Sequence, residues 1–269
     1  MKKIGIIGCG RMGEAILNGI VKQKGVSPKD IFVSDVDSAR LNRIKRVYGC
    51  DATFNNSKVA KMSDLIIMAV KPQDMISALG SISACLNRKK LVVSIAAGVT
   101  IKKISSVIGG DVPVARVMPN MPALVRKSFS AFSFSKKADK GLMRFAKAVF
   151  SSIGDVAEVR EKDMDAITAI SGSGPAYFFY LVEILIKSGI KLGLTPETAK
   201  RAAVKTALGS VELLNKFNQD ASILRKMATS KGGTTEAAFK VFGKERLNAI
   251  IEKGVRAARD RSKELSGSK

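Results

Sequence analysis

Up to about residue 160, short apolar runs alternate along the chain with stretches of helical periodicity. The apolar runs predict strands over Lys3–Ile7, Asp30–Ser34, Leu65–Val70, Leu91–Ile95, Val112–Val117 and Phe129–Phe134. The helical stretches predict helices over Met12–Lys24, Ser38–Tyr48, Pro72–Cys85 and Asp139–Phe150. Strands that alternate with helices are typical of a largely parallel sheet with helices on both faces. The uninterrupted apolar run Leu65–Val70 predicts a central strand buried on both sides.

From about Met164 onward the pattern is helical only. The predicted helices run from Pro175 to about Gly193, from Thr195 to about Phe217, briefly after Asp220, and from Thr235 to Leu265. Proline and threonine at the first two starts suit the first turn and the N-cap of a helix. We therefore predict an α/β domain over residues 1–162 followed by an all-helical domain over residues 163–269.

The composition narrows the chemistry. The chain has 269 residues, of which 46% are hydrophobic and 26% charged, so it can bury a sizeable core. Its three cysteines are widely spaced, which argues against a disulfide framework and fits a reducing cytoplasm. The sequence contains no histidine, so catalytic pairs with histidine are excluded and no metal site is expected. Carboxylates, hydroxyls, lysines, backbone amides or a bound cofactor must carry any reaction.

Lysine and arginine number 46 against 23 acidic residues, a net charge of +23. Nucleic-acid binding is one interpretation of such a charge. The basic residues are spread along the chain, however, and only three tyrosines and no tryptophan accompany them for base stacking. We favour a solvated basic surface that attracts small anionic ligands, and expect no nucleic-acid partner.

Two segments have some membrane character. The apolar run near Met1 ends at Gly8, which is too early for the core of a secretory signal. The stretch Asp165–Glu183 contains glycines, Pro175 and a charge, so we interpret it as a loop that opens a buried helix. A soluble, cytoplasmic protein without a membrane partner is expected.

Residues 8–13 read Gly-Cys-Gly-Arg-Met-Gly, directly after the first predicted strand and before the first helix. Gly8 permits the tight turn, Gly10 lets the backbone approach a pyrophosphate, and Gly13 allows the helix to pack closely on the strand. The amides at the helix start then face the phosphates. In this context the motif predicts a dinucleotide site, whereas the glycines alone would also fit an ordinary turn.

The end of the second predicted strand leaves the choice of dinucleotide open. Asp35 stands where an acidic residue usually binds the ribose 2′-hydroxyl of NAD. Ser34, Arg40 and Arg43 are instead the hydroxyl and basic residues that a 2′-phosphate of NADP requires. Capping of the next helix by Asp35 or Asp37 is a third interpretation.

Three further turns are candidates for ligand contacts. Ala69–Pro72 and Ser94–Gly98 follow predicted buried strands, at the strand ends where open α/β sheets bind ligands. Thr229–Thr235 places two glycines and two hydroxyl residues at a helix start, a nest of N–H groups that suits a carboxylate or phosphate. Ordinary turn chemistry and helix capping are the other interpretations.

Together these segments resemble the pyrroline-5-carboxylate reductase family over nearly the whole chain. The matching motifs occur in the same order, at residues 6–12, 69–73, 94–99, 116–120, 165–169, 171–177 and 232–235. The resemblance implies a Rossmann-like dinucleotide-binding domain followed by an all-α dimerisation and substrate-binding domain. It also implies reduction of (S)-1-pyrroline-5-carboxylate to L-proline by NADPH, or less favourably NADH, as the last step of proline biosynthesis. A homodimer that assembles into a decamer is implied too, with each active site built from two subunits.

The resemblance assigns roles to individual residues. Thr235 is implied as the catalytic residue, close to the ring nitrogen of the substrate. The implied substrate-binding residues are Glu161, Ser230, Gly232, Gly233, Thr234 and Thr235. The implied cofactor-binding residues are Ile7, Gly8, Cys9, Gly10, Arg11, Met12, Gly13, Ser34, Asn56, Ala69, Val70, Lys71, Pro72, Ala96, Ala97, Gly98 and Asn120.

Some positions depart from the family pattern. Met121 stands where threonine is usual, Arg126-Lys127 replaces a segment that usually has glycine, and Lys231 stands where proline is common. We expect these changes to affect substrate affinity and loop rigidity rather than the reaction. A β-hydroxyacid-dehydrogenase-like enzyme is disfavoured because no lysine follows Pro175 before Lys187. A basic regulatory protein that binds dinucleotide or nucleic acid without turnover is the third interpretation.

Overall fold

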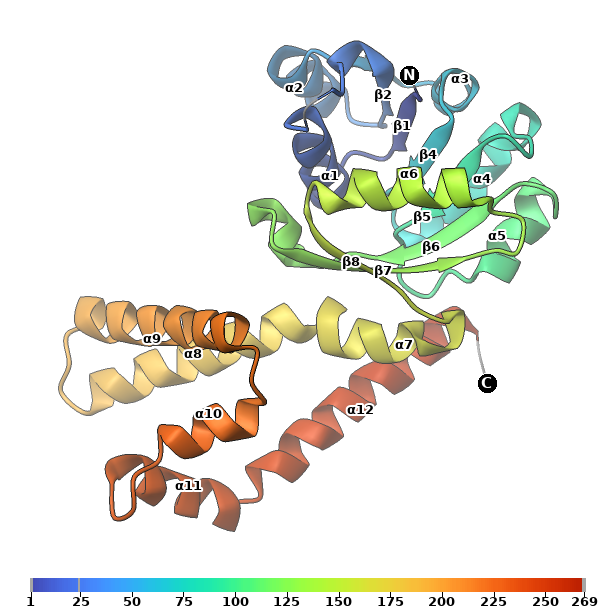
Figure 1. Cartoon of the computed structure of the whole chain (residues 1–269). Coiled ribbons are helices and arrows are strands. Elements are labelled where there is room, and N and C mark those ends of the chain that lie inside the picture. The colour runs from blue at the N-terminus through green and yellow to red at the C-terminus, as the bar shows by residue number, and fades with distance from the viewer. Residues whose placement is uncertain (1, 24, 268–269) are drawn as a thin grey trace. The chain divides into compact units, whose positions relative to one another are not determined.

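The computed structural model describes residues 2–23 and 25–267, and Figure 1 follows the chain from end to end. Within these residues the strands form one eight-stranded sheet of order β3-β2-β1-β4-β5-β6-β7-β8. The strands are β1 (Ile4–Ile7), β2 (Ile31–Ser34), β3 (Asp51–Thr53), β4 (Leu65–Met68), β5 (Leu91–Ser94), β6 (Val114–Met118), β7 (Ser128–Phe134) and β8 (Gly154–Glu158). Neighbouring strands are parallel except for the antiparallel pair β6 and β7. The largely parallel sheet predicted from the sequence is therefore confirmed.

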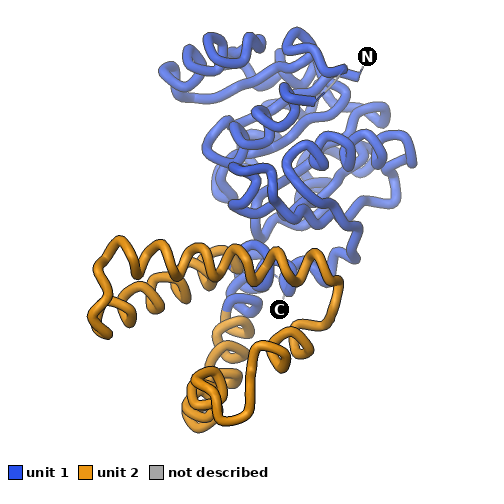
Figure 2. The backbone as a smooth tube through the Cα atoms, turned by 60° about the vertical axis from the view of Figure 1, so that its left-hand side comes forward, with its two compact units in different colours: residues 1–173, 258–269 blue, residues 174–257 orange. Residues whose placement is uncertain are grey.

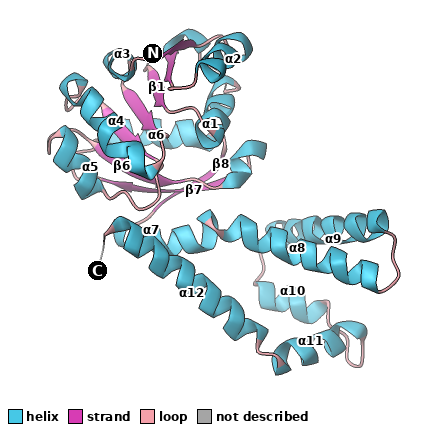
Figure 3. Ribbon diagram, turned by 180° about the vertical axis from the view of Figure 1, so that it is seen from behind, coloured by secondary structure: helices cyan, strands magenta, loops and turns pink. Residues whose placement is uncertain are grey.

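Helices cover both faces of this sheet, as Figure 3 shows. The helices α1 (Arg11–Val21), α2 (Ser38–Tyr48) and α6 (Lys140–Ser151) pack into one apolar core, and α3 (Asn56–Met62), α4 (Met75–Ile82) and α5 (Ile101–Ile108) pack into the other. Side chains alternate along each strand, so Leu65 and Ile67 of β4 enter the first core while Ile66 and Met68 enter the second. All four are fully buried, which confirms that this run is a central strand.

The sequence pattern missed several short elements. The strands β3 and β8 begin with Asp51 and Gly154, and their polar or half-exposed residues give no apolar run. The helices α3 and α5 span only 7 and 8 residues, but side chains cap them: Asn55 accepts from the amide of Lys58 and Thr100 from that of Lys103. The predicted helix over Pro72–Cys85 was also too long, because its two ends are 3-10 turns on either side of α4.

The chain separates into two compact units, coloured in Figure 2. One unit comprises Met1–Ser173 together with Ala258–Lys269, and the other comprises Gly174–Ala257. The second unit is helical throughout its described residues, as predicted. Its elements are α8 (Gly174–Lys191), α9 (Pro196–Phe217), α10 (Ala221–Met227), α11 (Thr234–Lys244) and the first part of α12 (Leu247–Ser266). The predicted single helix from Thr235 to Leu265 was wrong. The helix is interrupted between α11 and α12, where Arg246 has φ +52°.

The chain returns to the first unit at its C-terminal end, which the sequence pattern did not reveal. The segment that leads from the sheet to α8 is also irregular. It contains a 3-10 turn (Glu161–Asp163), the short helix α7 (Met164–Ile167) and a π-helical stretch (Thr168–Gly172).

The helical unit leaves large apolar side chains uncovered. Four successive residues of α8 expose more than half of their surface: Phe178, Phe179, Tyr180 and Leu181. The buried helix predicted here is therefore not buried within the single chain. In the described residues, the run Glu161–Lys191 is long and apolar enough to cross a membrane by length and composition alone. A large exposed apolar surface also marks protein–protein interfaces.

Candidate functional site

The order of the sheet reverses at β1, which pairs with β2 on one side and with β4 on the other. The turns that leave β1 and β4 therefore meet at the carboxyl edge of the sheet, where such folds bind ligands. Their contact is direct: the amide of Ala69 donates to the carbonyl of Ile7 over 2.8 Å. The turn after β5 lies next in line, with the amide of Ile95 donating to the carbonyl of Met68. Three predicted cofactor segments are thus brought together.

The glycine turn has the shape of a phosphate cradle. Gly8 has φ +82°, and a Cβ there would lie 2.8 Å from the Val70 side chain, so only glycine fits. A Cβ on Gly13 would lie 2.5 Å from the carbonyl oxygen of Gly8. A Cβ on Gly10, by contrast, would meet no atom within 4 Å. Because Gly10 is the N-cap of α1 and provides no side chain, the first amides of the helix face open space and fit a pyrophosphate.

Cys9 links this turn to the end of β2. Its backbone amide donates a 2.6 Å hydrogen bond to the carboxylate of Asp35. Its own thiol is fully buried, and burial raises the pKa of Cys9 to about 12. Burial also pushes the pKa of Asp35 upward, but hydrogen bonds from Cys9, Arg40 and Asp37 outweigh it and hold the pKa of this carboxyl below its usual value. Asp35 is therefore a buried, charged carboxylate beside the glycine turn.

Ser34 does not present its hydroxyl to solvent. It is fully buried, and its hydroxyl donates to the side-chain carbonyl of Asn56 over 2.7 Å. Asn56 is half-buried at the start of α3, and its amide nitrogen donates in turn to the Ser81 hydroxyl. The structure thus brings together two of the residues implied to bind the cofactor, with Asn56 nearer to solvent.

The turn after β5 is fixed from the far end of the chain. Gly98 has φ +73°, and a Cβ there would lie 2.9 Å from Leu265, in the last turn of α12. Ala96 is almost fully buried in the same turn. The side chain of Asn120 also has internal partners, since its Nδ2 donates to Ser171 and its Oδ1 accepts from the amide of Phe129. The positions of these residues agree with a role in shaping the cofactor edge.

A buried ionic cluster surrounds Arg116, a residue to which the sequence pattern assigned no role. Its guanidinium lies 3.7 Å from the carboxylate of Glu161 and 3.6 Å from that of Asp165. Glu161 also accepts a 2.7 Å hydrogen bond from the amide of Ile101, and Asp165 accepts one from the hydroxyl of Ser262. The sequence could have indicated this cluster, because Arg116 interrupts an otherwise apolar strand and a buried charge requires partners.

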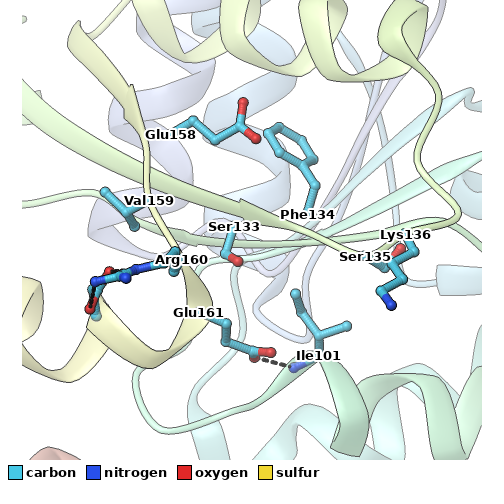
Figure 4. A pocket seen from close by; sticks show the side chains of 10 residues that line it. Ile101, Ser133, Phe134, Ser135, Lys136, Glu158, Val159, Arg160 and Glu161 are labelled. Atoms are coloured by element: carbon cyan, nitrogen blue, oxygen red, sulfur yellow. Dashed lines mark hydrogen bonds and ion pairs between the residues drawn. The ribbon is translucent and has the colours of Figure 1, made fainter.

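A hollow of about 860 Å³ lies beside this cluster, and Figure 4 shows the side chains around it. Of the predicted site residues, only Glu161 lines it. The other charged residues of the lining are Lys136, Glu158, Arg160 and Asp163. Figure 4 also shows the hydrogen bond from Ile101 to Glu161 at its wall. The hollow is thus distinct from the glycine turn.

The other predicted site lies in the helical unit, at the start of α11. Gly233 is the N-cap of this helix, and its amide donates to the carbonyl of Ser230. Gly232 has φ +75°, and its amide donates a 2.7 Å hydrogen bond to the carboxylate of Glu236. The amides of Thr234 and Thr235 come next, in the first turn, where a helix offers its N–H groups no internal acceptor. The helix starts at the predicted place, but the amides of both glycines already have acceptors within the turn, which leaves those of Thr234 and Thr235.

Comparisons with known proteins find similarity along the whole chain. A family model for pyrroline-5-carboxylate reductase dimerisation matches residues 161–265, and one for coenzyme F420-dependent NADP oxidoreductase matches residues 3–98. Pyrroline-5-carboxylate reductase 2 of Bacillus subtilis (strain 168) is 37% identical over 266 residues, which cover 98% of this chain and 95% of that protein.

Two solved structures are similar over 98% of both chains. One is pyrroline carboxylate reductase of Plasmodium falciparum with NADP bound, with a TM-score of 0.89 and 32% identity. The other is a pyrroline-5-carboxylate reductase from Coxiella burnetii, with a TM-score of 0.92 and 34% identity.

A doubly wound sheet with a glycine turn at its switch point defines a dinucleotide-binding protein. The full-length similarity then gives the family. The chain belongs to the pyrroline-5-carboxylate reductase family.

Proposed function

We propose that this protein reduces (S)-1-pyrroline-5-carboxylate to L-proline with NAD(P)H, in the last step of proline biosynthesis. One observation carries the proposal: a chain 37% identical to a reductase of this name has both a glycine turn after β1 and a Gly-Gly-Thr-Thr turn before α11. The first turn fits a pyrophosphate, and the second offers amides and hydroxyls to a carboxylate.

The dinucleotide is held at the carboxyl edge of the sheet. The amides at the start of α1 receive the pyrophosphate where Gly10 leaves room for it. The small residues Ala69 and Ala96 line the turns after β4 and β5, where a ribose approaches the backbone. The reduced nicotinamide, when bound, supplies the hydride that the reaction requires.

The helical turn holds the other reactant. The amides of Thr234 and Thr235 receive the substrate carboxylate, since the amide of Gly232 already donates to Glu236. The Thr235 hydroxyl hydrogen-bonds the ring nitrogen, which fixes the orientation of the ring carbon that is reduced. A protonated imine accepts hydride without a strong general acid, and this explains how a chain without histidine can carry the reaction. Glu161 is the further substrate-side residue that the family resemblance implies.

The helical unit supplies the dimer. The family model that matches residues 161–265 describes a dimerisation domain. The uncovered apolar side chains of α8 provide the surface that a second copy buries. We propose that each active site combines the sheet edge of one subunit with the α11 turn of its partner. Further assembly to a decamer, a cytoplasmic location, and the lack of nucleic-acid or membrane partners belong to the same proposal. Light scattering coupled to gel filtration would give the number of subunits.

The reaction is tested by incubating the purified protein with pyrroline-5-carboxylate and either reduced dinucleotide. We expect oxidation of the dinucleotide with formation of an equal amount of L-proline. Thr235→Val keeps the shape of the side chain but removes its hydroxyl, and it should lower kcat while dinucleotide binding stays normal. Thr206→Val, on the surface of α9, is the matched control. Dinucleotide binding without any L-proline formation would overturn the proposal.

A further inference from the structure

The charged residues beside the end of β2 are paired with one another. The Nη1 atom of Arg40 lies 2.9 Å from both carboxylate oxygens of Asp35, and Nη2 lies 3.5 Å from Asp37. Arg43, one turn further along α2, donates a 2.7 Å hydrogen bond to Glu14. Both arginines that a 2′-phosphate would require are therefore already paired with carboxylates.

The carboxylate of Asp35 is built into the cofactor edge. Asp35 follows the last residue of β2, only 7% of its surface is exposed, and it accepts the amide of Cys9 from the glycine turn. An acid in this position provides an acceptor for the 2′-hydroxyl of NADH, whereas it repels the phosphate that NADPH carries there. We infer that Asp35 makes NADH, rather than NADPH, the preferred reductant of this enzyme. This inference rests on the proposed function.

The charged groups around Asp35 also favour NADH over NADPH. Asp35, Asp37 and Glu14 contribute three carboxylates against the two guanidinium groups that pair with them. The next residue along, Val36, is 96% exposed, and its side chain has no group that can donate to a phosphate. In a chain with a net charge of +23, this is a place where the flanking cations are neutralised.

Movement of Arg40 toward a 2′-phosphate would not remove the preference for NADH over NADPH. Arg40 would have to leave Asp35, and a carboxylate with so little exposure would then lose its cation. The side chain of Arg40 is 36% exposed and that of Asp35 only 4%, so separating them leaves a buried carboxylate without its cation, which is unfavourable. NADPH binding therefore has to disrupt an existing pair, while NADH binding does not.

Calorimetric titration of the purified protein with NADH and with NADPH tests the inference independently of turnover. We expect Kd to be at least about tenfold lower for NADH, since like charges in contact cost more than the ~1.4 kcal/mol that tenfold represents. ADP-ribose and its 2′-phosphate should show the same order. Asp35→Asn keeps the acceptor for Cys9 but frees Arg40, so the ratio of the two Kd values should shift toward NADPH by about tenfold or more.

Asp51→Asn is the matched control, because Asp51 is an exposed acid on the neighbouring strand β3 and pairs with Lys58 of α3. It should leave the ratio unchanged. If Asp35→Asn does not fold, Asp37→Asn serves instead, since asparagine caps α2 as well as aspartate does. Tighter binding of NADPH by the unmodified protein, or an unchanged ratio in the folded variants, would overturn the inference while leaving the reductase function intact. Binding of neither dinucleotide would overturn both.

Discussion

The hydroxyl of Ser262 donates a 2.7 Å hydrogen bond to the carboxylate of Asp165, although 97 residues separate them in sequence. Both side chains are buried, and Asp165 also faces the guanidinium of Arg116. The bond therefore fixes the last turns of α12 to α7, close to the sheet. Through the packing of Leu265 on Gly98, the same end of α12 also supports the turn after β5.

Replacing Ser262 by alanine should destabilise the protein without changing its sites directly. The variant leaves a buried carboxylate short of one hydrogen bond, which costs about 1–3 kcal/mol. Urea unfolding at a fixed subunit concentration measures this loss, because the stability of an oligomer depends on concentration. Ser151→Ala removes an exposed hydrogen bond within α6 and should have little effect. Equal losses in the two variants would contradict the role of the Ser262–Asp165 bond.

The glycine turn gives a pair of contrasting substitutions. Gly13→Ala places a methyl group against the carbonyl of Gly8 and should lower both stability and dinucleotide affinity. Gly10→Ala meets open space, so the fold should be kept while the affinity falls about tenfold or more, because the methyl group occupies the position of the pyrophosphate. Gly80→Ala, in α4, is the control and should stabilise by about 0.5–1 kcal/mol. Normal affinity in Gly10→Ala would place the pyrophosphate elsewhere.

Glu161 accepts the amide of Ile101 at the start of α5, and this bond predicts a graded effect. Glu161→Ala leaves that amide without its acceptor and should cost about 1 kcal/mol or more in the free energy of unfolding. Glu161→Gln retains an acceptor oxygen and should restore much of that loss. Thermal unfolding of the two variants, at equal concentration, provides the measurement. A glutamine variant as unstable as the alanine variant would show that the charge near Arg116, and not the hydrogen bond, is what matters.

The buried thiol of Cys9 predicts a dependence of stability on alkaline pH. Its pKa is raised by burial from 9.0 to about 12, so the folded state keeps the proton longer than the unfolded state does. The contribution of Cys9 to stability is therefore complete below about pH 9 and is lost as the pH rises toward 12. Compared with the unmodified protein, Cys9→Ala should lose stability less steeply over this range in urea unfolding. Parallel curves for the two proteins would contradict the prediction, and Cys85→Ala controls for removal of a thiol.

The sequence predicted those features that depend on local pattern. The central strands are continuous apolar runs such as Leu65–Met68. The glycine turn is recognisable because each of its glycines stands where a side chain would obstruct the turn, the helix packing or a ligand. The start of α11 was recognisable for the same reason, since two glycines before two threonines suit a helix N-terminus. These features need no knowledge of distant residues.

What the sequence could not predict depends on contacts between distant segments. The pairing of Arg40 with Asp35 and of Arg43 with Glu14 decides whether those arginines are free for a phosphate, and no pattern along the chain reveals it. The return of α12 to the sheet through Ser262 is of the same kind. Short capped helices such as α3 were not predicted, because seven residues are too few to display helical periodicity.

The central claim, that this protein reduces pyrroline-5-carboxylate at sites formed by two subunits, is tested most directly by mixing two impaired variants. Gly10→Ala impairs the sheet edge and Thr235→Val impairs the α11 turn. After the subunits are unfolded together and refolded, a hybrid dimer contains one site with both defects and one with neither. The account predicts that L-proline formation returns in the mixture while each variant alone stays impaired. A mixture no more active than its components, when unmodified protein treated in the same way recovers its activity, would contradict it.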